Sequence, residues 1–228
     1  MLNLLDELAI KHGTDKSSLH HNYTEPYFQI FQPLRQKKLK LVEIGVYNGS
    51  SLRMWEDFFP NAEIYGIDLD PKAMAHQKGR IKIALGDQND ENFLQRFQKK
   101  VGKIDILIDD GSHRPEHQLK SLNCLFPSLL KNGIYVIEDL CSSFLKTYGP
   151  SAGLHNSRNT LEYLKSVLDV IHAEKSHGGL LGDEVTEHIK AIHFYPRIAF
   201  LFKGKVCKQL PGTKGIDKRK KRGRFLWG

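Results

Sequence analysis

Short apolar runs alternate with longer amphipathic segments along most of this chain. The apolar runs are continuous and rich in β-branched residues, at 39–45, 63–68, 80–85, 104–109 and 134–139. Such runs are typical of strands buried on both faces of a parallel sheet. Helix-length segments lie between them, at 50–59, from 71 onward, at 91–99 (capped by Asp90) and at 114–131. This alternation predicts an α/β fold built on a doubly wound, mostly parallel sheet.

Further elements are expected before and after this core. Residues 2–11 predict a helix that ends at Gly13, and Thr24 is expected to cap a second helix. After a long loop at 140–157 come a helix at 159–172 and two strands, 188–194 and 197–203, joined at Tyr195-Pro196 as an antiparallel edge hairpin. We expect one domain over residues 1–211, with 1–38 as a helical cap, and a basic, flexible tail at 212–228.

Charge and cysteine content narrow the function classes. The net charge is +8, but seven basic residues and one acid between 214 and 224 supply +6, so the remaining chain carries +2 (8 − 6). A near-neutral body disfavours nucleic acid as the partner, RNA included. The three cysteines form no C-x-x-C pair, which argues against a zinc site or a disulfide framework. Asp6 and Glu7 interrupt any signal peptide, and no stretch reaches the length of a membrane span, so a cytoplasmic location is expected.

Acidic residues follow the fourth and fifth predicted strands directly. The fourth strand runs into Ile-Asp-Asp-Gly-Ser-His at 108–113, and the fifth into Val-Ile-Glu-Asp-Leu at 136–140. Parallel strands end at the same edge of a sheet, where open α/β folds bind their ligands. Carboxylates crowded there repel one another unless a cation lies among them. The pattern therefore predicts a metal site, while strand alternation turns Asp109 away from Asp110 and gives it a supporting role.

The ends of the first three strands indicate a second ligand. Glu43 is followed by a Gly-x-x-x-Gly turn from Gly45 to Gly49, which departs from the Gly-x-Gly-x-x-Gly of pyrophosphate binding. The second strand ends at Asp68, where a carboxylate can accept ribose hydroxyls, and the third runs into Asp87-Gln88, placed to reach an adenine edge. Each residue alone could be a helix cap or a surface charge. Together they favour an adenosyl ligand that carries positive charge.

These motifs resemble those of the class I S-adenosylmethionine-dependent methyltransferases, and more narrowly the metal-dependent sugar O-methyltransferases of macrolide biosynthesis. The resemblance runs from about residue 12 to about residue 204 and includes His193-Phe194-Tyr195. Two departures are expected: the additional N-terminal domain of one family member does not fit within 228 residues, and the glycine turn is compact. The resemblance implies a Rossmann-like class I methyltransferase fold, S-adenosylmethionine and Mg²⁺ as cofactors, and methyl transfer to a hydroxyl of a sugar in a glycosylated natural product or glycan.

The resemblance also implies residue roles. His113 is the expected general base, since imidazole titrates near neutral pH. The expected magnesium ligands are Asp110, Glu138 and Asp139, since oxygen ligands suit Mg²⁺. The expected cofactor-binding residues are Thr14, Glu43, Gly45, Val46, Tyr47, Asn48, Gly49, Ser51, Asp68, Asp87, Gln88 and Asp110. Among them Glu43 and the Gly45 turn would hold the methionine portion, and Thr14 matches a segment that closes over the cofactor.

Rival interpretations stay open on the sequence alone. Asp68 would also suit the ribose of a nicotinamide cofactor, as in a dehydrogenase or epimerase, although the glycine spacing argues against it. The chain could also be a non-catalytic cofactor-binding module that docks through its basic tail, and a homo-oligomer is compatible with either. Other residues have simpler expected places. His20, His21 and Tyr23 are expected in a polar loop, with lining of the substrate pocket as the alternative. The remaining expectations are packing or surface for His117, core for Trp55, Phe58 and Phe59, and surface for His155, His172 and His177.

Overall fold

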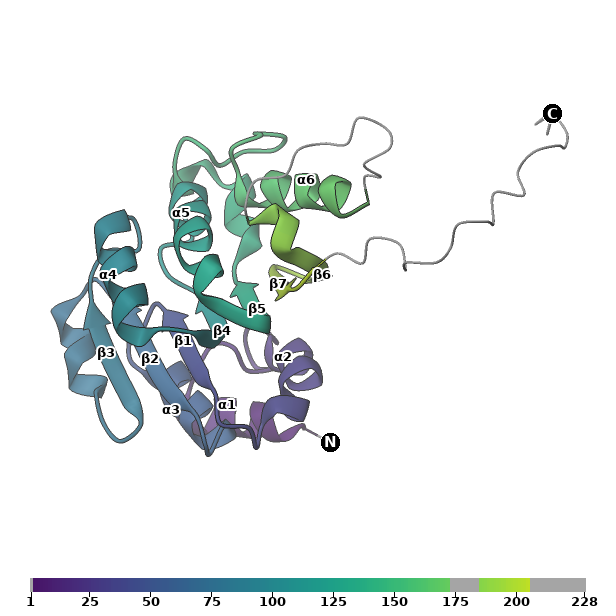
Figure 1. Ribbon diagram of the computed structural model, residues 1–228. Helices are drawn as coiled ribbons and strands as arrows, with labels where there is room; N and C mark the ends of the chain where they lie inside the picture. Colours follow the sequence, from purple (N-terminus) through teal and green to yellow (C-terminus); the bar gives the residue numbers. More distant parts are fainter. Residues whose placement is uncertain (1, 173–184, 206–228) are drawn as a thin grey trace, which may run out of the picture.

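The computed structural model describes residues 2–172 and 185–205, which form a seven-stranded sheet with helices on both faces (Figure 1). The strands lie in the order β3-β2-β1-β4-β5-β7-β6. Strands β1 to β5 are parallel, whereas β7 is antiparallel to both β5 and β6. Their bounds are Lys40–Ile44 (β1), Glu63–Asp68 (β2), Ile81–Leu85 (β3), Ile104–Asp109 (β4), Leu129–Ile137 (β5), Ile189–Tyr195 (β6) and Ile198–Lys203 (β7). The predicted doubly wound, mostly parallel sheet with an antiparallel edge hairpin is confirmed.

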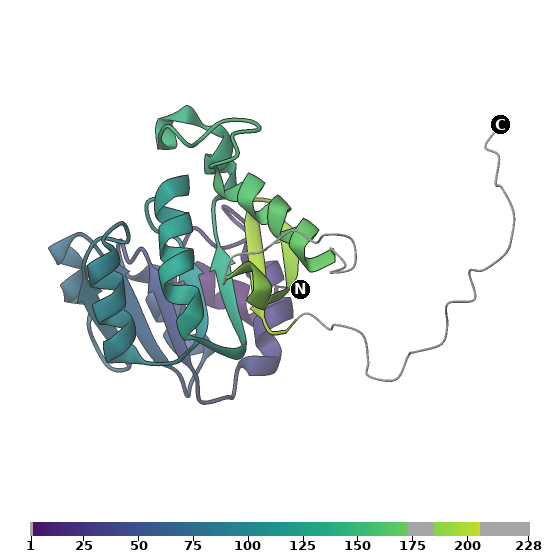
Figure 2. The same cartoon turned by 45° about the horizontal axis from the view of Figure 1, so that its top comes forward.

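Within the described residues, three α-helices cover each face of the sheet. They are Leu4–His12 (α1), Thr24–Phe31 (α2), Ser50–Phe58 (α3), Glu91–Val101 (α4), Pro115–Leu125 (α5) and Thr160–His172 (α6). Helices α1, α2 and α3 bury Tyr27, Phe31 and Trp55 on one face, where the rings pack largely edge to face. Helices α4, α5 and α6 cover the other face and stand in front of the sheet in Figure 2. The core placement predicted for Trp55, Phe58 and Phe59 is confirmed.

Strand alternation places three strand-end acids on one face. Leu41, Ile108 and Val136 point into the core under α1, α2 and α3. Because side chains alternate with a period of two, the residues two positions later belong to the same face. These residues are Glu43, Asp110 and Glu138. The three carboxylates therefore gather on the side of the sheet that the N-terminal helices cover.

Helix ends mostly follow the predicted caps. Gly13 ends α1 with a φ of 69°, and Asp90 caps α4 by accepting from two backbone amides of its first turn. The prediction for Thr24 is wrong. Thr24 is the first residue of α2, and its hydroxyl donates to the buried carboxylate of Asp6 at 2.7 Å. A carboxylate from a neighbouring helix outcompetes the local backbone for this hydroxyl.

The segment between β4 and β5 also departs from prediction. Helix α5 ends at Leu125 rather than near residue 131, because Pro127 stands in the next turn and cannot continue an α-helix. β5 consequently starts at Leu129. The loop predicted at 140–157 contains two short 3₁₀ turns, at Leu140–Phe144 and Lys146–Tyr148. The predicted tail at 212–228 and His177 lie outside the described residues.

Candidate active site

A cavity of about 600 Å³ opens at the carboxyl ends of the parallel strands. Its wall comprises the turn after β1, the ends of β2, β3 and β4, and part of the N-terminal segment. The residues predicted from sequence that line it are Thr14, Gly45, Val46, Tyr47, Asn48, Ser51, Asp68, Asp87, Gln88, Asp110, His113 and Asp139. Glu43, Gly49 and Glu138 are not part of the lining. Most of the predicted site is therefore brought together in one place, and two of its acids lie behind the wall.

The glycine turn packs against the end of β4. Gly45 has a φ of 93°, and a Cβ at this position would lie 2.0 Å from the backbone oxygen of Asp110. Gly49 has a φ of 70°, and a Cβ there would lie 2.6 Å from the ring of His76. The two glycines therefore let the turn approach the end of β4 and the ring of His76, as well as a ligand.

Asp68 holds the same turn from β2. Its Oδ2 accepts hydrogen bonds from the amides of Val46 (2.8 Å) and Tyr47 (3.0 Å), and its Oδ1 accepts from the amide of Asp70 (2.8 Å). A carboxylate oxygen can accept more than one hydrogen bond, so Asp68 keeps capacity toward the cavity. Its ribose-binding role stays a prediction.

Gln88 lies between the cavity and a buried polar network. Its Nε2 donates to Asp109 at 3.1 Å, and its Oε1 accepts from the amide of Ser112 at 2.7 Å. Asp109 is fully buried and also accepts hydrogen bonds from the hydroxyls of Ser121 and Tyr135. Asp109 thus faces α5, away from the cavity, as strand alternation predicted. It orients Gln88 and the loop after β4.

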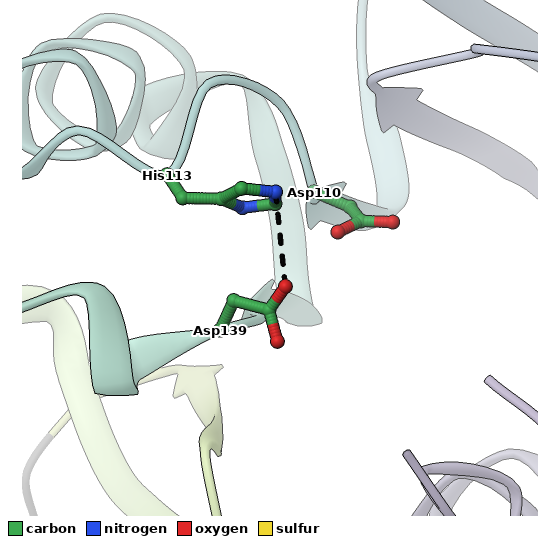
Figure 3. Close-up of side chains that lie close together, drawn as sticks. All are labelled: Asp110, His113 and Asp139. Atoms are coloured by element: carbon green, nitrogen blue, oxygen red, sulfur yellow. Dashed lines mark ion pairs between the residues drawn. The ribbon is translucent and has the colours of Figure 1, made fainter. Parts of the chain in front are cut away.

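Asp110, His113 and Asp139 lie close together at the rim of the cavity, with the ring of His113 facing the carboxylate of Asp139 (Figure 3). Each offers one ligand atom, and these atoms lie within 4.8 Å of one another. The Nε2 of His113 is 3.7 Å from Oδ2 of Asp139. The Nδ1 of His113 is buried without a hydrogen-bond partner among the described residues. This arrangement can hold a divalent cation or move a proton.

The backbone is strained at the same place. His113 and Asp139 have φ values of 56° and 51°, a left-handed conformation that residues other than glycine adopt at a cost. Tyr47, which also lines the cavity, has a φ of 48°. Strain of this kind concentrates at functional sites, where the surrounding structure enforces it.

Lys16 lies behind this group and was not predicted. Its side chain is 1% exposed, and its Nζ lies 2.5 Å from Asp110 Oδ2, 2.8 Å from Glu138 Oε2 and 3.5 Å from Glu43 Oε1. We call Lys16 and these three acids the Lys16 cluster. A lysine in a polar stretch is normally exposed, so the sequence pattern did not indicate this burial. Of the same stretch, only Thr14, two positions earlier, was predicted to belong to the site.

Burial and charge act against each other within the Lys16 cluster. Burial, the largest cause, raises the pKa of Glu43 to about 7, while Lys16 acts to lower it. Burial and then the charge of Asp110 raise the pKa of Glu138. Burial alone would lower the pKa of the Lys16 ammonium, but the surrounding carboxylates raise it well above its usual value. Lys16 is therefore a cation, surrounded by an excess of acidic groups.

Two tyrosines complete the contacts of the acids after β5. The hydroxyl of Tyr27 donates to Glu138 Oε1, and that of Tyr23 donates to Asp139 Oδ1, both at 2.5 Å. Both phenols are buried, which raises their pKa and keeps them protonated donors. His21 Nδ1 lies 3.9 Å from Asp139 Oδ1, so the predicted polar loop reaches an acid of the site.

His117 was expected in packing or at the surface, and it is half-buried in the structure. It lines the cavity, and its Nδ1 lies 2.9 Å from the hydroxyl of Ser112. Burial, followed by the charge of Arg114, lowers its pKa. His113 precedes α5 in a left-handed conformation and His117 lies in the first turn of α5, and both line the same cavity. None of the described helices combines the length and apolar character needed to cross a bilayer.

Comparison with known proteins relates this geometry to a reaction class. Residues 42–140 match the family described as a methyltransferase domain. The mycinamicin VI 2''-O-methyltransferase of Micromonospora griseorubida is 36% identical over 211 residues, covering 88% of this chain and 53% of that protein. The demethylmacrocin O-methyltransferase of Streptomyces fradiae is 34% identical over 210 residues, covering 88% and 53%. This chain spans about half the length of the curated relatives that it matches.

Solved structures of a methyltransferase also match this chain. The MycE methyltransferase of the mycinamycin pathway, in complex with Mg and SAH, superimposes with a TM-score of 0.81 at 36% identity, over 90% of this chain and 55% of that one. The same enzyme with Mg, SAH and mycinamycin VI superimposes with a TM-score of 0.83 over 94% and 57%. This chain therefore shares the fold of the MycE methyltransferase, and its residues 42–140 match the methyltransferase-domain family.

Proposed function

We propose that this chain transfers a methyl group from S-adenosylmethionine to a hydroxyl group with the help of Mg²⁺. One observation carries the proposal: the cavity that contains the glycine turn also contains Asp110, His113 and Asp139. The named relatives methylate sugars of natural products. The acceptor in this proposal is accordingly a sugar hydroxyl of a glycosylated natural product or a glycan.

The cavity fits the methyl donor. Its volume of about 600 Å³ lies within the usual range for cofactor sites, and acidic residues at its wall suit a sulfonium cation. In this proposal the Gly45 turn holds the methionine portion, with Glu43 behind the cavity wall, Asp68 accepts the ribose hydroxyls, and Gln88 and Asp87 contact the adenine. Thr14 closes over the donor from the N-terminal segment, and the remaining contacts come from Val46, Tyr47, Asn48, Gly49, Ser51 and Asp110.

The acidic group fits a magnesium ion. The proposed ligands are Asp110, Glu138 and Asp139, whose carboxylate oxygens are the ligand type that Mg²⁺ prefers. Asp110 and Asp139 already lie within 4.8 Å of one another through their ligand atoms, and Glu138 directly precedes Asp139. When bound, the ion lowers the pKa of a hydroxyl beside it.

His113 is the proposed general base. It accepts the proton of the acceptor hydroxyl at Nε2, the nitrogen that faces Asp139. The ring of His113 packs edge to face against Tyr148, with 6.2 Å between the ring centroids, so the proton moves to a group that is already in place.

Methyl transfer from labelled S-adenosylmethionine to glycosylated acceptors, with Mg²⁺ or with EDTA, tests the proposal. His113→Ala should lower turnover ~10²–10⁴-fold and leave Mn²⁺ and S-adenosylhomocysteine affinity unchanged, because a base is needed only for the proton transfer. Asp139→Ala should abolish the stimulation by Mg²⁺. His172→Ala, at the exposed end of α6, is the matched control and should behave as the wild type. Equal turnover in EDTA would remove the metal from the mechanism.

Calorimetric titration separates this proposal from the dehydrogenase alternative. The wild-type chain should bind S-adenosylhomocysteine and show no heat with NAD. Asp68→Ala should weaken the binding of S-adenosylhomocysteine through both the ribose and the turn that Asp68 holds. Binding of NAD without S-adenosylhomocysteine would favour the alternative.

A further inference from the structure

The Lys16 ammonium is surrounded by carboxylates from three strand ends. Asp110 follows β4, Glu138 follows β5, and Glu43 belongs to β1, and all three approach one buried nitrogen. Lysine is almost never fully buried unless it is paired. One ammonium among three acids leaves an excess of acidic groups at the spot, and such an excess is also what attracts a divalent cation.

The backbone around Lys16 is fixed, so the ammonium cannot easily withdraw. The carbonyl oxygen of Lys16 accepts hydrogen bonds from the amides of Tyr23 (2.9 Å) and Thr24 (3.1 Å). The Asp6 carboxylate ties the same loop to α1 by accepting from the amide and hydroxyl of Ser18 and from the hydroxyl of Thr24. Lys16 is therefore held toward the acids by a loop that is itself anchored.

Asp110 belongs to two groups at once. Its Oδ2 contacts Lys16, and the same carboxylate forms the cavity-side group with His113 and Asp139. We propose that Lys16 is a built-in counterion that competes with the divalent cation of the proposed function for the Asp110 and Glu138 carboxylates, and thereby weakens the binding of that cation. The inference rests on the proposed function for the presence of a cation site.

Two consequences follow from this arrangement. An ammonium and a divalent cation that share one carboxylate repel each other, and this repulsion is stronger in a buried site than in water. Without Lys16, the three acids repel one another until a cation replaces the ammonium. Removing Lys16 should therefore tighten cation binding and make the fold depend on the cation.

Mn²⁺ binding to the full chain, followed by the electron paramagnetic resonance signal of the free ion, measures the first consequence. Lys16→Met, which has nearly the same length and no charge, should bind Mn²⁺ at least ~10-fold more tightly than the wild type. Lys16→Gln keeps a hydrogen-bond donor without the charge, so it remains available if the methionine variant does not fold. Lys11→Met is the control, because Lys11 pairs with Asp57 at the surface and its loss should leave the affinity unchanged.

Thermal unfolding with EDTA and with Mg²⁺ measures the second consequence. Both Lys16 variants should unfold at a lower temperature than the wild type in EDTA, and Mg²⁺ should raise their melting temperature more than that of the wild type. Mn²⁺ affinity that is unchanged or weaker in both Lys16 variants overturns the inference, as does equal tightening in Lys11→Met. The absence of Mn²⁺ binding in every protein also overturns the inference. If the Lys16 variants bind Mn²⁺ more tightly but the wild type transfers no methyl group, the inference stands and the proposed function is rejected.

Discussion

Gly45→Ala should destabilise the protein through contact with the end of β4. An added Cβ would lie 2.0 Å from the backbone oxygen of Asp110, and the φ of 93° is unfavourable for any residue with a Cβ. The backbone conformation costs ~1–2 kcal/mol. Forcing an atom into a packed site costs a further ~1–3 kcal/mol, because a backbone oxygen cannot rotate aside. The free energy of unfolding should therefore fall by roughly 2–5 kcal/mol.

Gly13→Ala is the matched control for this prediction. Gly13 has a φ of 69°, also in the left-handed region, but an added Cβ meets no atom within 4 Å. It should lose only the conformational part, ~1–2 kcal/mol. Urea denaturation followed by far-ultraviolet circular dichroism would measure both variants. If Gly45→Ala lost no more stability than Gly13→Ala, the close approach of the turn to Asp110 would be refuted.

Three further predictions concern the buried acids and the cavity. The pKa of Glu43 is raised from its usual 4.5 to about 7, so between these values the folded protein binds more protons than the unfolded one and stability falls as pH rises. Glu43→Gln removes this penalty. As the pH rises from 4.5 to about 7, its free energy of unfolding in urea melts should therefore rise by roughly 3 kcal/mol relative to that of the wild type. A pH-independent difference between the two proteins would refute the raised pKa of Glu43. Tyr27→Phe leaves a buried carboxylate oxygen without its donor and should cost ~1–3 kcal/mol in the same melts, whereas Tyr65→Phe, on an exposed pair, should cost under ~0.5 kcal/mol; equal losses would contradict this. His117→Gln should weaken S-adenosylhomocysteine binding in calorimetry by less than Asp68→Ala does, because His117 only borders the cavity; a larger loss would make it a principal contact.

The sheet could be predicted from the sequence because buried parallel strands carry a strong local signal. The runs at 63–68 and 104–109 match β2 and β4 residue for residue. Two predicted helix ends were wrong, one because a local helix breaker was overlooked and one because of a tertiary contact. Pro127 shortened the helix predicted to reach residue 131, and Asp6 drew the Thr24 hydroxyl away from its expected cap.

The cavity wall was predictable for a related reason. A parallel sheet brings the residues after each strand to one edge, so Asp68, Asp110 and Asp139 could be assigned to one site without knowledge of the loops. The partners of these acids could not be assigned. Tyr23 and Lys16 contact acids more than 90 positions away in the chain, and no local pattern specifies which acid a side chain will reach.

The N-terminal segment is consequently part of the site, although the methyltransferase-domain match begins at residue 42. Alternation along β1, β4 and β5 directs the acids of the Lys16 cluster under α1, α2 and α3, where carboxylates without partners would carry a large desolvation cost. Donors from Lys16 and Tyr27 offset that cost. The matched domain alone would expose these acids to one another with no counterion. The strand ends therefore supply the charge of the site, and the first helices supply the contacts that let this charge be buried.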